Sequence, residues 1–264
     1  MNEIEIRPVG VVRSADEETI HVPLQGNRAV IEIFPQYGAA LERIEEYSHL
    51  WIQSWFHEAK RDVLATVPSK VNPDLPRYGV FAIRSPLRPN PIALTLVSLE
   101  RVEGNRLLVS GLDAVDGTPI LDIKPYFEQD IVFSPRTARI TAARREVRRA
   151  LLEREAVLHH REDCMDLRIA VSMALIAEDH FGKLNDDALV VEVAGSPCLG
   201  DVIQGLTRAR LANPPRFLFR ESAGARRSAW TKDGRRLSVE MGQGIDAMGP
   251  DALPGEEKFT VVME

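Results

Sequence analysis

The sequence has few cysteines, no long apolar segment and no excess of positive charge. Its 264 residues include only two cysteines, Cys164 and Cys198, which are too few for a disulfide framework. No apolar run approaches the roughly 20 residues needed to span a bilayer, and the first residues lack the basic and apolar regions of a signal peptide. We therefore expect a cytoplasmic protein without a membrane partner.

The charge balance argues against general binding of nucleic acids. The chain has 39 acidic residues against 33 Lys and Arg residues, a formal net charge of -6. A molecule of this charge does not attract the phosphate backbone over its whole surface. We expect no DNA partner, and an RNA partner requires a local basic patch.

The first 140 residues have the pattern of a mainly β domain. Short β-branched or alternating segments predict strands at 4–12, 29–34, 49–56, 78–83, 92–103, 106–112 and 120–125. One helix is predicted at 37–47, and a long polar loop at 60–77. Short strands at regular spacing favour a small closed β-barrel. No GxGxxG turn opens a helix, which argues against a Rossmann-type domain.

After residue 140 the pattern changes, and we predict a separate α+β domain at 141–264. Helices are expected at 137–159, 166–181 and 200–210, with Gly182 ending the second of them. The expected strands are 188–193, 216–220, 237–241 and 259–262. Residues 242–257 are rich in glycine, proline and acidic side chains, which is typical of a loose segment.

Three prolines between Pro86 and Pro91 stiffen a polar loop in the first domain. The loop presents Arg84, Arg88 and Asn90, and an arginine can hold a carboxylate or phosphate through two parallel hydrogen bonds. A small-molecule site is one interpretation. A stiff turn with merely solvated arginines is the other, and the residues alone do not separate the two.

A second polar cluster surrounds an Asp116-Gly117 turn. Asp113 precedes this turn, and Asp122 and Lys124 share one face of the strand that follows it. Acidic groups here could bind a ribose hydroxyl or an ammonium group, and Lys124 could bind an anion. An ordinary turn with a cross-strand ion pair is the simpler reading of these residues.

Three segments of the first domain resemble the TrmO family, also called TsaA-like or YaeB-like. They are YSHLWI at 47–52, GVFAIRSPLRPNPI at 79–92 and LDAVDGTPILDIKPY at 112–126. The resemblance extends over residues 5–130. It implies a small β-barrel, S-adenosylmethionine as methyl donor, a homodimer, and N6-methylation of threonylcarbamoyladenosine beside the tRNA anticodon.

The resemblance also implies roles for individual residues. Cofactor contacts are implied for Gln25, Gly26, His57, Glu58, Arg84, Leu94, Leu112 and Asp113. Glu58 stands where the family has glutamine, and the arginine of the family's N-terminal loop is missing beside Leu24. These departures bear on the acceptor more than on the donor. As substrate-binding residues we predict Arg88, Asn90 and Lys124.

Methyl transfer from a sulfonium needs little acid–base chemistry, because the donor is already activated and correct placement supplies most of the catalysis. An amide-like nitrogen would still benefit from a base that removes its proton. His57, Asp113 and Tyr126 are the catalytic candidates, and the sequence does not rank them. For His57 a hydrogen-bonded structural role is an equal alternative.

The second domain contains a candidate zinc site. Cys164 and Cys198 both lie at predicted helix starts, where the helix N-terminus lowers the pKa of a thiol. With His160, and with Glu162 or Asp163, they form a mixed ligand set. Two buried free cysteines are the alternative, and the composition favours it.

The same region resembles an FmdE-like domain, which often binds metal. The similar segments are HREDCMDLRIA at 160–170 and CLGDVIQ at 198–204. Glu162 replaces the second histidine of that family's HGHxCPG motif, and Met165-Asp166 replace its Pro-Gly pair.

The sequence is consistent with three functions. The leading hypothesis is a methyltransferase acting on N6 of a modified tRNA adenosine. The second keeps the methyl donor but has a small-molecule or metal-chelate acceptor delivered by the second domain. The third is a non-catalytic S-adenosylmethionine sensor or metal-handling adaptor, which would bind the donor without turnover.

Overall fold

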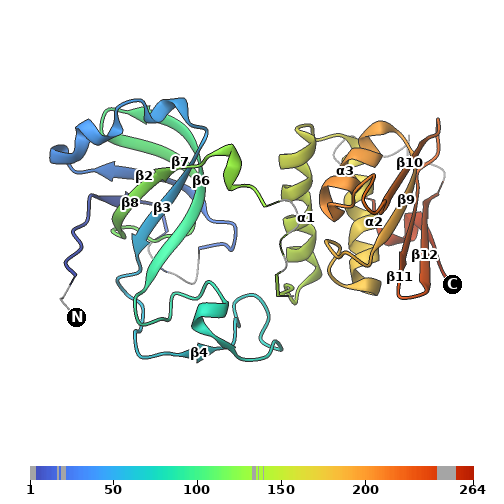
Figure 1. Cartoon of the computed structure of the whole chain (residues 1–264), viewed down its shortest axis with the longest axis horizontal. Helices are drawn as coiled ribbons and strands as arrows, with labels where there is room; N and C mark the ends of the chain where they lie inside the picture. Colours follow the sequence, from blue (N-terminus) through green and yellow to red (C-terminus); the bar gives the residue numbers. More distant parts are fainter. Residues whose placement is uncertain are drawn as a thin grey trace. The chain divides into compact units, whose positions relative to one another are not determined.

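The computed structural model describes residues 4–16, 18, 22–132, 135, 137–138, 140–242 and 254–264. The chain forms two compact units, Met1–Ile131 and Val132–Glu264 (Figure 1). The division between the units falls at Ile131, so the boundary predicted near residue 140 is about nine residues too late. No helix within the described ranges is long and apolar enough to cross a membrane.

Six antiparallel strands of the first unit close into a barrel in the order β1-β2-β7-β6-β3-β8. Their bounds are β1 (Gly10–Arg13), β2 (Asn27–Ile33), β3 (His49–Trp55), β6 (Ile92–Glu103), β7 (Arg106–Leu112) and β8 (Pro119–Pro125). Closure occurs at β1, where Gly10 pairs with Ile33 of β2 and with Ile120 of β8. The predicted closed barrel is therefore confirmed.

Alternating side chains fill the interior of the barrel. On β3 the buried residues Leu50, Ile52 and Ser54 alternate with half-exposed ones, as expected for a strand with one face in the core. Ile31 from β2 and Leu107 from β7 are fully buried in the same core. Removing each such side chain from water contributes about 1.5–3 kcal/mol, and a one-residue slip would expose the whole set.

The connection between β2 and β3 is less helical than predicted. Instead of one helix over 37–47 it contains two 3-10 helices, η1 (Pro35–Leu41) and η2 (Ile44–Glu46). Arg43 between them has a left-handed backbone with φ of 67°, which interrupts regular helical hydrogen bonding. The chain before β1 is also less regular than predicted, because the strand expected from residue 4 begins only at Gly10.

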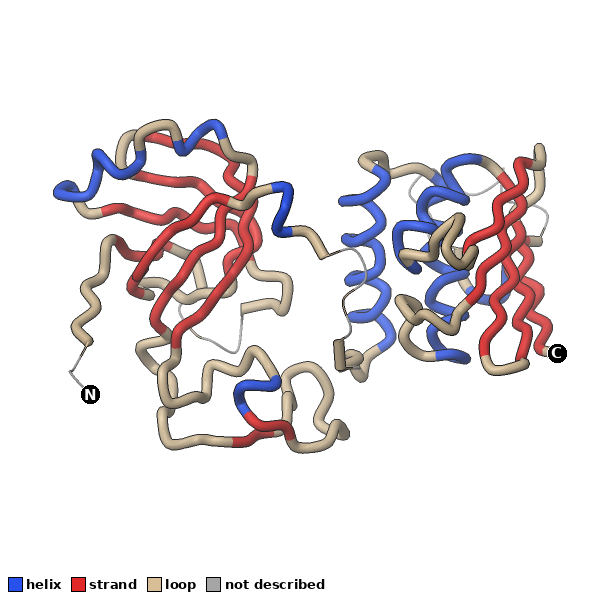
Figure 2. Tube along the Cα trace, viewed as in Figure 1, coloured by secondary structure: helices blue, strands red, loops and turns tan. Residues whose placement is uncertain are grey.

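The long connection between β3 and β6 forms a lobe that projects from one end of the barrel (Figures 1 and 2). It holds a two-stranded sheet of β4 (Ala65–Thr66) and β5 (Tyr78–Gly79), followed by the 3-10 turn η3 (Val80–Ala82). The strand predicted over 78–83 is therefore limited to two residues. A further 3-10 turn, η4 (Glu128–Asp130), follows β8.

The second unit is a five-stranded sheet with helices on one face (Figure 2). The strand order is β10-β9-β11-β12-β13, in which only β10 and β9 are parallel. The bounds are β9 (Val190–Gly195), β10 (Phe217–Glu221), β11 (Arg227–Lys232), β12 (Arg235–Met241) and β13 (Phe259–Met263). This arrangement confirms the predicted α+β class, with β11 as an unpredicted strand.

Three helices lie on that face: α1 (Arg145–His160), α2 (Met165–Phe181) and α3 (Pro197–Thr207). Of these, α2 and α3 pack on the strands, and α1 packs on α2 and α3 (Figure 1). α2 is buried along most of its length and packs with α3 in the core of this unit. Gly182 ends α2 as predicted, whereas α1 begins eight residues later than the predicted 137. The 3-10 turn η6 (Glu256–Lys258) precedes β13, and most of the segment predicted to be loose lies outside the described residues.

Candidate functional site

The strand register brings several predicted site segments to one end of the barrel. β3 ends there at Trp55, opposite the first residue of β6, Ile92. β7 ends there at Leu112, opposite the first residue of β2, Asn27. The chain segments that follow β3 and β7 or precede β2 and β6 therefore all emerge at this end, which we call the site end.

Asp113, directly after β7, is the central acidic residue of the site end. Its Oδ1 accepts a hydrogen bond of 2.5 Å from the Thr95 hydroxyl on β6. The side chain retains exposed surface, yet surrounding protein removes part of its hydration, and this desolvation raises the pKa of Asp113. The Thr95 hydrogen bond and the charges of Arg84 and Lys70 act in the opposite direction.

The turn containing Gln25 and Gly26 packs directly against the end of β7. Gly26 has φ of 68°, and a Cβ at this position would lie 2.5 Å from the carbonyl carbon of Gly111 and 2.6 Å from that of Leu112. Only glycine fits such a close approach of two backbones. Lys70 Nζ fixes the start of the same turn by donating to the Val22 carbonyl at 2.5 Å.

Arg84 is displayed by a loop that Arg88 holds in shape. Arg88 donates from Nε to the Ser85 carbonyl at 2.7 Å and from Nη2 to the carbonyls of Val80 and Ile83 at 3.0 and 2.6 Å. These bonds also explain why the segment does not continue as a strand. Arg84 itself is exposed, and among the described residues no acidic side chain forms an ion pair with it.

The structure thus gives the two arginines different roles. Arg88 is occupied by backbone carbonyls, which makes it a structural clamp, and a contact between Arg88 and substrate stays a prediction. Arg84 is close enough to Asp113 for its charge to lower the pKa of that carboxyl. Its guanidinium is available to an anionic group at the site end.

The other predicted cofactor residues of the site end differ in exposure. His57 and Glu58 follow β3 as exposed neighbours, with 3.9 Å between His57 Nε2 and Glu58 Oε1. Leu94 is 48% exposed on β6, whereas Leu112 is 1% exposed and belongs to the barrel core. Leu112 can therefore offer a ligand its backbone but not its side chain.

Asn90, in the segment before β6, lines a cavity of about 540 Å³ beside the end of β3 and the start of β8. Trp55 and Arg61 line the same cavity, with the Arg61 guanidinium carbon 4.5 Å from the centre of the Trp55 ring. The remaining lining residues are apolar, and a mainly apolar cavity with an aromatic ring and a few polar groups suits a flat organic group. A substrate contact of Asn90 stays a prediction.

Tyr126 and Lys124 lie toward the opposite end of the barrel. The Tyr126 amide bonds to the His49 carbonyl, at the start of β3, and Lys124 pairs with Asp122 at 2.5 Å. Residues along a strand are spaced by about 3.3 Å, so on the order of 15–20 Å of β3 separates Tyr126 from the site end. Within one chain, Tyr126 is therefore not brought together with His57 and Asp113, and a catalytic role for Tyr126 stays a prediction.

The predicted zinc ligands His160, Cys164 and Cys198 lie together in the second unit. Asp163 is not among them, because its carboxylate pairs with Arg168. One expectation was wrong: burial, and then the nearby Cys164, raise the pKa of the Cys198 thiol, although it lies in the first turn of α3. Burial disfavours the charged thiolate, which is the direction opposite to the one expected from the helix start.

Comparison with known proteins identifies the first unit. The family model for the tRNA-methyltransferase O N-terminal domain matches residues 11–130. A probable S-adenosyl-L-methionine-binding protein of Methanothermobacter thermautotrophicus is 46% identical over 130 residues, which are 48% of this chain and 92% of that protein. The chain belongs to the TrmO family. This family of S-adenosylmethionine-dependent methyltransferases is the one whose motifs the first domain resembles.

Two further relatives of this TrmO-family protein extend the comparison. A probable S-adenosyl-L-methionine-binding protein of Archaeoglobus fulgidus is 36% identical over 222 residues, which are 80% of this chain and 60% of that protein. A mouse tRNA (adenine(37)-N6)-methyltransferase is 41% identical over 133 residues, which are 45% of this chain and 30% of the mouse protein. The chain thus spans less than two thirds of the length of either relative. The FmdE-like resemblance of the second unit stays a prediction.

The structure adds residues that the sequence did not indicate. Thr95 and Lys70 join the site end through Asp113 and the Val22 carbonyl. No local pattern marks them, because they come from a strand and a loop whose register is known only after the barrel has closed.

We expect Gly26→Ala to weaken binding of S-adenosylmethionine by at least tenfold, because the new methyl group must push the Gln25 turn away from β7. Isothermal titration calorimetry would measure the affinity. Gly104→Ala is a matched control, since Gly104 also has positive φ but no atom within 4 Å of its Cβ position. Equal donor affinities of the two variants would refute the proposed role of the turn.

Proposed function

We propose that this protein transfers the methyl group of S-adenosylmethionine to N6 of threonylcarbamoyladenosine beside the tRNA anticodon. Membership of the TrmO family supports methyl transfer, and the printed activity of the mouse relative supports a tRNA adenine acceptor. The observation that carries the proposal is the meeting of Gly26, Arg84 and Asp113 at one end of the barrel.

The residues at the site end fit the chemical groups of the donor. S-adenosylmethionine has a carboxylate, an ammonium group and ribose hydroxyls, and when bound it supplies an activated methyl group on a positive sulfur. The available guanidinium of Arg84 can pair with the carboxylate. The Asp113 carboxylate can accept hydrogen bonds from hydroxyl or ammonium groups. Because Gly26 has no side chain, the backbone of its turn can approach the ligand closely.

Catalysis then depends chiefly on placing the acceptor nitrogen in line with the methyl group. His57 is exposed beside the site end, so we assign it the role of accepting the proton that the nitrogen loses. Asp113 has a donor-binding role in this scheme. Tyr126 and Lys124 could serve the same site only from a second chain, and the homodimer stays a prediction.

A small-molecule acceptor is the second candidate, and the net charge of -6 favours it. Acidic proteins bind polyanionic RNA only through local basic patches. The site end does contain positive groups, Arg84 and Lys70, beside Asp113. The nature of the acceptor therefore has to be measured directly.

Incubation of the full chain with methyl-labelled S-adenosylmethionine and total tRNA, followed by digestion to nucleosides, tests the acceptor. We expect label in the N6-threonylcarbamoyl nucleoside. A parallel incubation with a metabolite extract covers the second candidate. Label found only in the metabolite fraction would exclude the tRNA function. Label in neither fraction would contradict both candidates and favour an adaptor that binds the donor without turnover.

Arg84→Ala should weaken donor binding by about 10–100-fold, since a hydrogen bond between charged groups contributes about 1.5–3 kcal/mol. Arg101→Ala is the matched control, because Arg101 is an exposed arginine near the far end of β6 and pairs with Glu103. It should bind the donor with wild-type affinity. An Arg84→Ala protein that does the same would remove Arg84 from the site.

Donor binding should also weaken as the pH is lowered. Asp113 must be ionised to accept hydrogen bonds from the donor, and its raised pKa means that the carboxylate is lost at higher pH than for an ordinary aspartate of pKa about 3.9. Calorimetry across the acidic range would measure the effect in a His57→Gln background, which removes the imidazole beside the site end. Asp113→Asn should bind more weakly and lose the dependence; an unchanged pH profile in that variant would contradict the assignment.

A further inference from the structure

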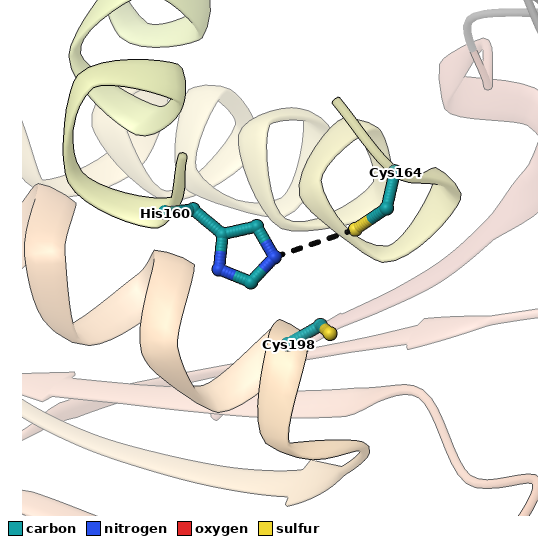
Figure 3. Close-up of side chains that lie close together, drawn as sticks. All are labelled: His160, Cys164 and Cys198. Carbon is teal, nitrogen blue, oxygen red and sulfur yellow. Dashed lines mark hydrogen bonds between the residues drawn. The ribbon is translucent and has the colours of Figure 1, made fainter. Parts of the chain in front are cut away.

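Three potential metal ligands in the second unit come from three different helices and meet at one point. His160 is the last residue of α1, Cys164 is the N-cap of α2, and Cys198 lies in the first turn of α3. Their ligand atoms all lie within 4.8 Å of one another, and each residue is partly buried. Figure 3 shows the His160 ring facing the Cys164 sulfur, with Cys198 beside them.

The spacing of these atoms is that of a small coordination shell. His160 Nε2 lies 3.5 Å from Cys164 Sγ. A zinc ion with Zn–S of about 2.3 Å and Zn–N of about 2.0–2.1 Å separates two tetrahedral ligand atoms by about 3.6 Å. The pair can therefore bind one ion with little movement.

Asp201 orients the histidine for such a role. Its Oδ2 lies 2.7 Å from His160 Nδ1, and its Oδ1 lies 3.1 Å from His159 Nε2. Because a carboxylate accepts the proton on Nδ1, the neutral imidazole presents the lone pair of Nε2 toward Cys164. The His160 side chain is only 9% exposed, so this orientation is held by the protein.

Two of the neighbouring carboxylates have other partners. Asp163 pairs with Arg168, and Asp166 accepts hydrogen bonds from Ser196 and Arg226. Glu162, the other carboxylate of the predicted ligand set, is not among the residues whose ligand atoms meet, so the two sulfurs and the imidazole form the ligand set. Two thiolates with one imidazole suit Zn²⁺ in ligand type and geometry.

We propose that His160, Cys164 and Cys198 bind one Zn²⁺ ion whose fourth position is open to water or to a ligand. Three protein ligands with one open position are characteristic of zinc sites that exchange a ligand or do chemistry. Asp201 is the positioning residue of this site. The site lies wholly within the second unit, so it does not depend on the proposed methyl transfer.

Metal titration of the full chain tests the proposal. After reduction and removal of metal, Zn²⁺ is added in competition with a coloured chelator, and Co²⁺ serves as a spectroscopic probe. We expect one ion per chain, and a Co²⁺ spectrum with tetrahedral and thiolate-to-metal bands. Less than stoichiometric Zn²⁺ binding by the reduced wild-type protein, with both cysteines present as free thiols, would overturn the site.

Variants assign the ligands. Cys164→Ser should lose Zn²⁺ affinity without unfolding, because serine is a good N-cap and keeps the Leu167 amide satisfied; Cys198→Ser should lose it equally. Asp201→Ala should weaken binding by about 10–100-fold and alter the Co²⁺ spectrum. His180→Ala, at the far exposed end of α2, is the matched control with wild-type affinity.

Circular dichroism of each variant separates loss of ligand from loss of fold. Wild-type Zn²⁺ affinity in both folded serine variants would refute the assignment. Donor binding by the first unit provides an independent measure of integrity, and it should be the same in all these variants.

Discussion

Closure of the barrel at β1 is the constraint on which the arrangement of the first unit depends. This strand has only four residues, yet it pairs with β2 on one side and with β8 on the other. Gly10 and Val11 are each paired on both sides, and a Cβ at Gly10 would lie 2.5 Å from the Glu32 carbonyl oxygen. A closed ring of six strands fixes every register, since a slip at any pair would expose a core face.

The site end follows from that closure. β7 and β6 are adjacent, so Asp113 after β7 meets Thr95 near the start of β6. β2 is the other neighbour of β7, so the turn before β2 packs on the Gly111–Leu112 backbone. The Arg84 loop is held separately by the carbonyl contacts of Arg88. Rigid strands and one clamped loop thus position the polar groups, which is what a precise small-molecule site requires.

Much of the fold could be predicted because its signals are local. The strands predicted at 92–103 and 106–112 have the bounds of β6 and β7, because Gly104-Asn105 between two apolar runs is a hairpin signal; Gly104 takes the positive φ that such a turn uses. β11 was missed although Asp233-Gly234, both at positive φ, joins it to β12. That dipeptide is a strong hairpin signal, but Trp230 is the only large apolar side chain in β11, so the strand lacks an alternating apolar pattern.

The candidate site was less predictable, because roles of side chains depend on direction and distance. Asp113 and Tyr126 belong to one sequence motif, but β8 lies between them and carries Tyr126 toward the other end of the barrel. Arg84 and Arg88 share one stiff loop, and only the structure shows that Arg88 is turned toward backbone carbonyls. For Cys198, the helix start was predicted correctly, whereas the desolvation that raises the pKa of its thiol was not.

The second unit places a Cys₂His cluster on an α+β scaffold in the same chain as the barrel. The two sites depend on different interactions. The site end relies on backbone approach and exposed charge, whereas the cluster relies on soft ligands and a carboxylate that orients the imidazole.

A crystal structure of the full chain with S-adenosylmethionine would test the central claim most directly. We expect the methionine carboxylate to pair with Arg84, a hydroxyl or ammonium group to bond to Asp113, and the ligand to lie against the Gly26 turn. A donor bound elsewhere, such as in the cavity lined by Trp55 and Asn90, with Arg84 and Asp113 uncontacted, would contradict it.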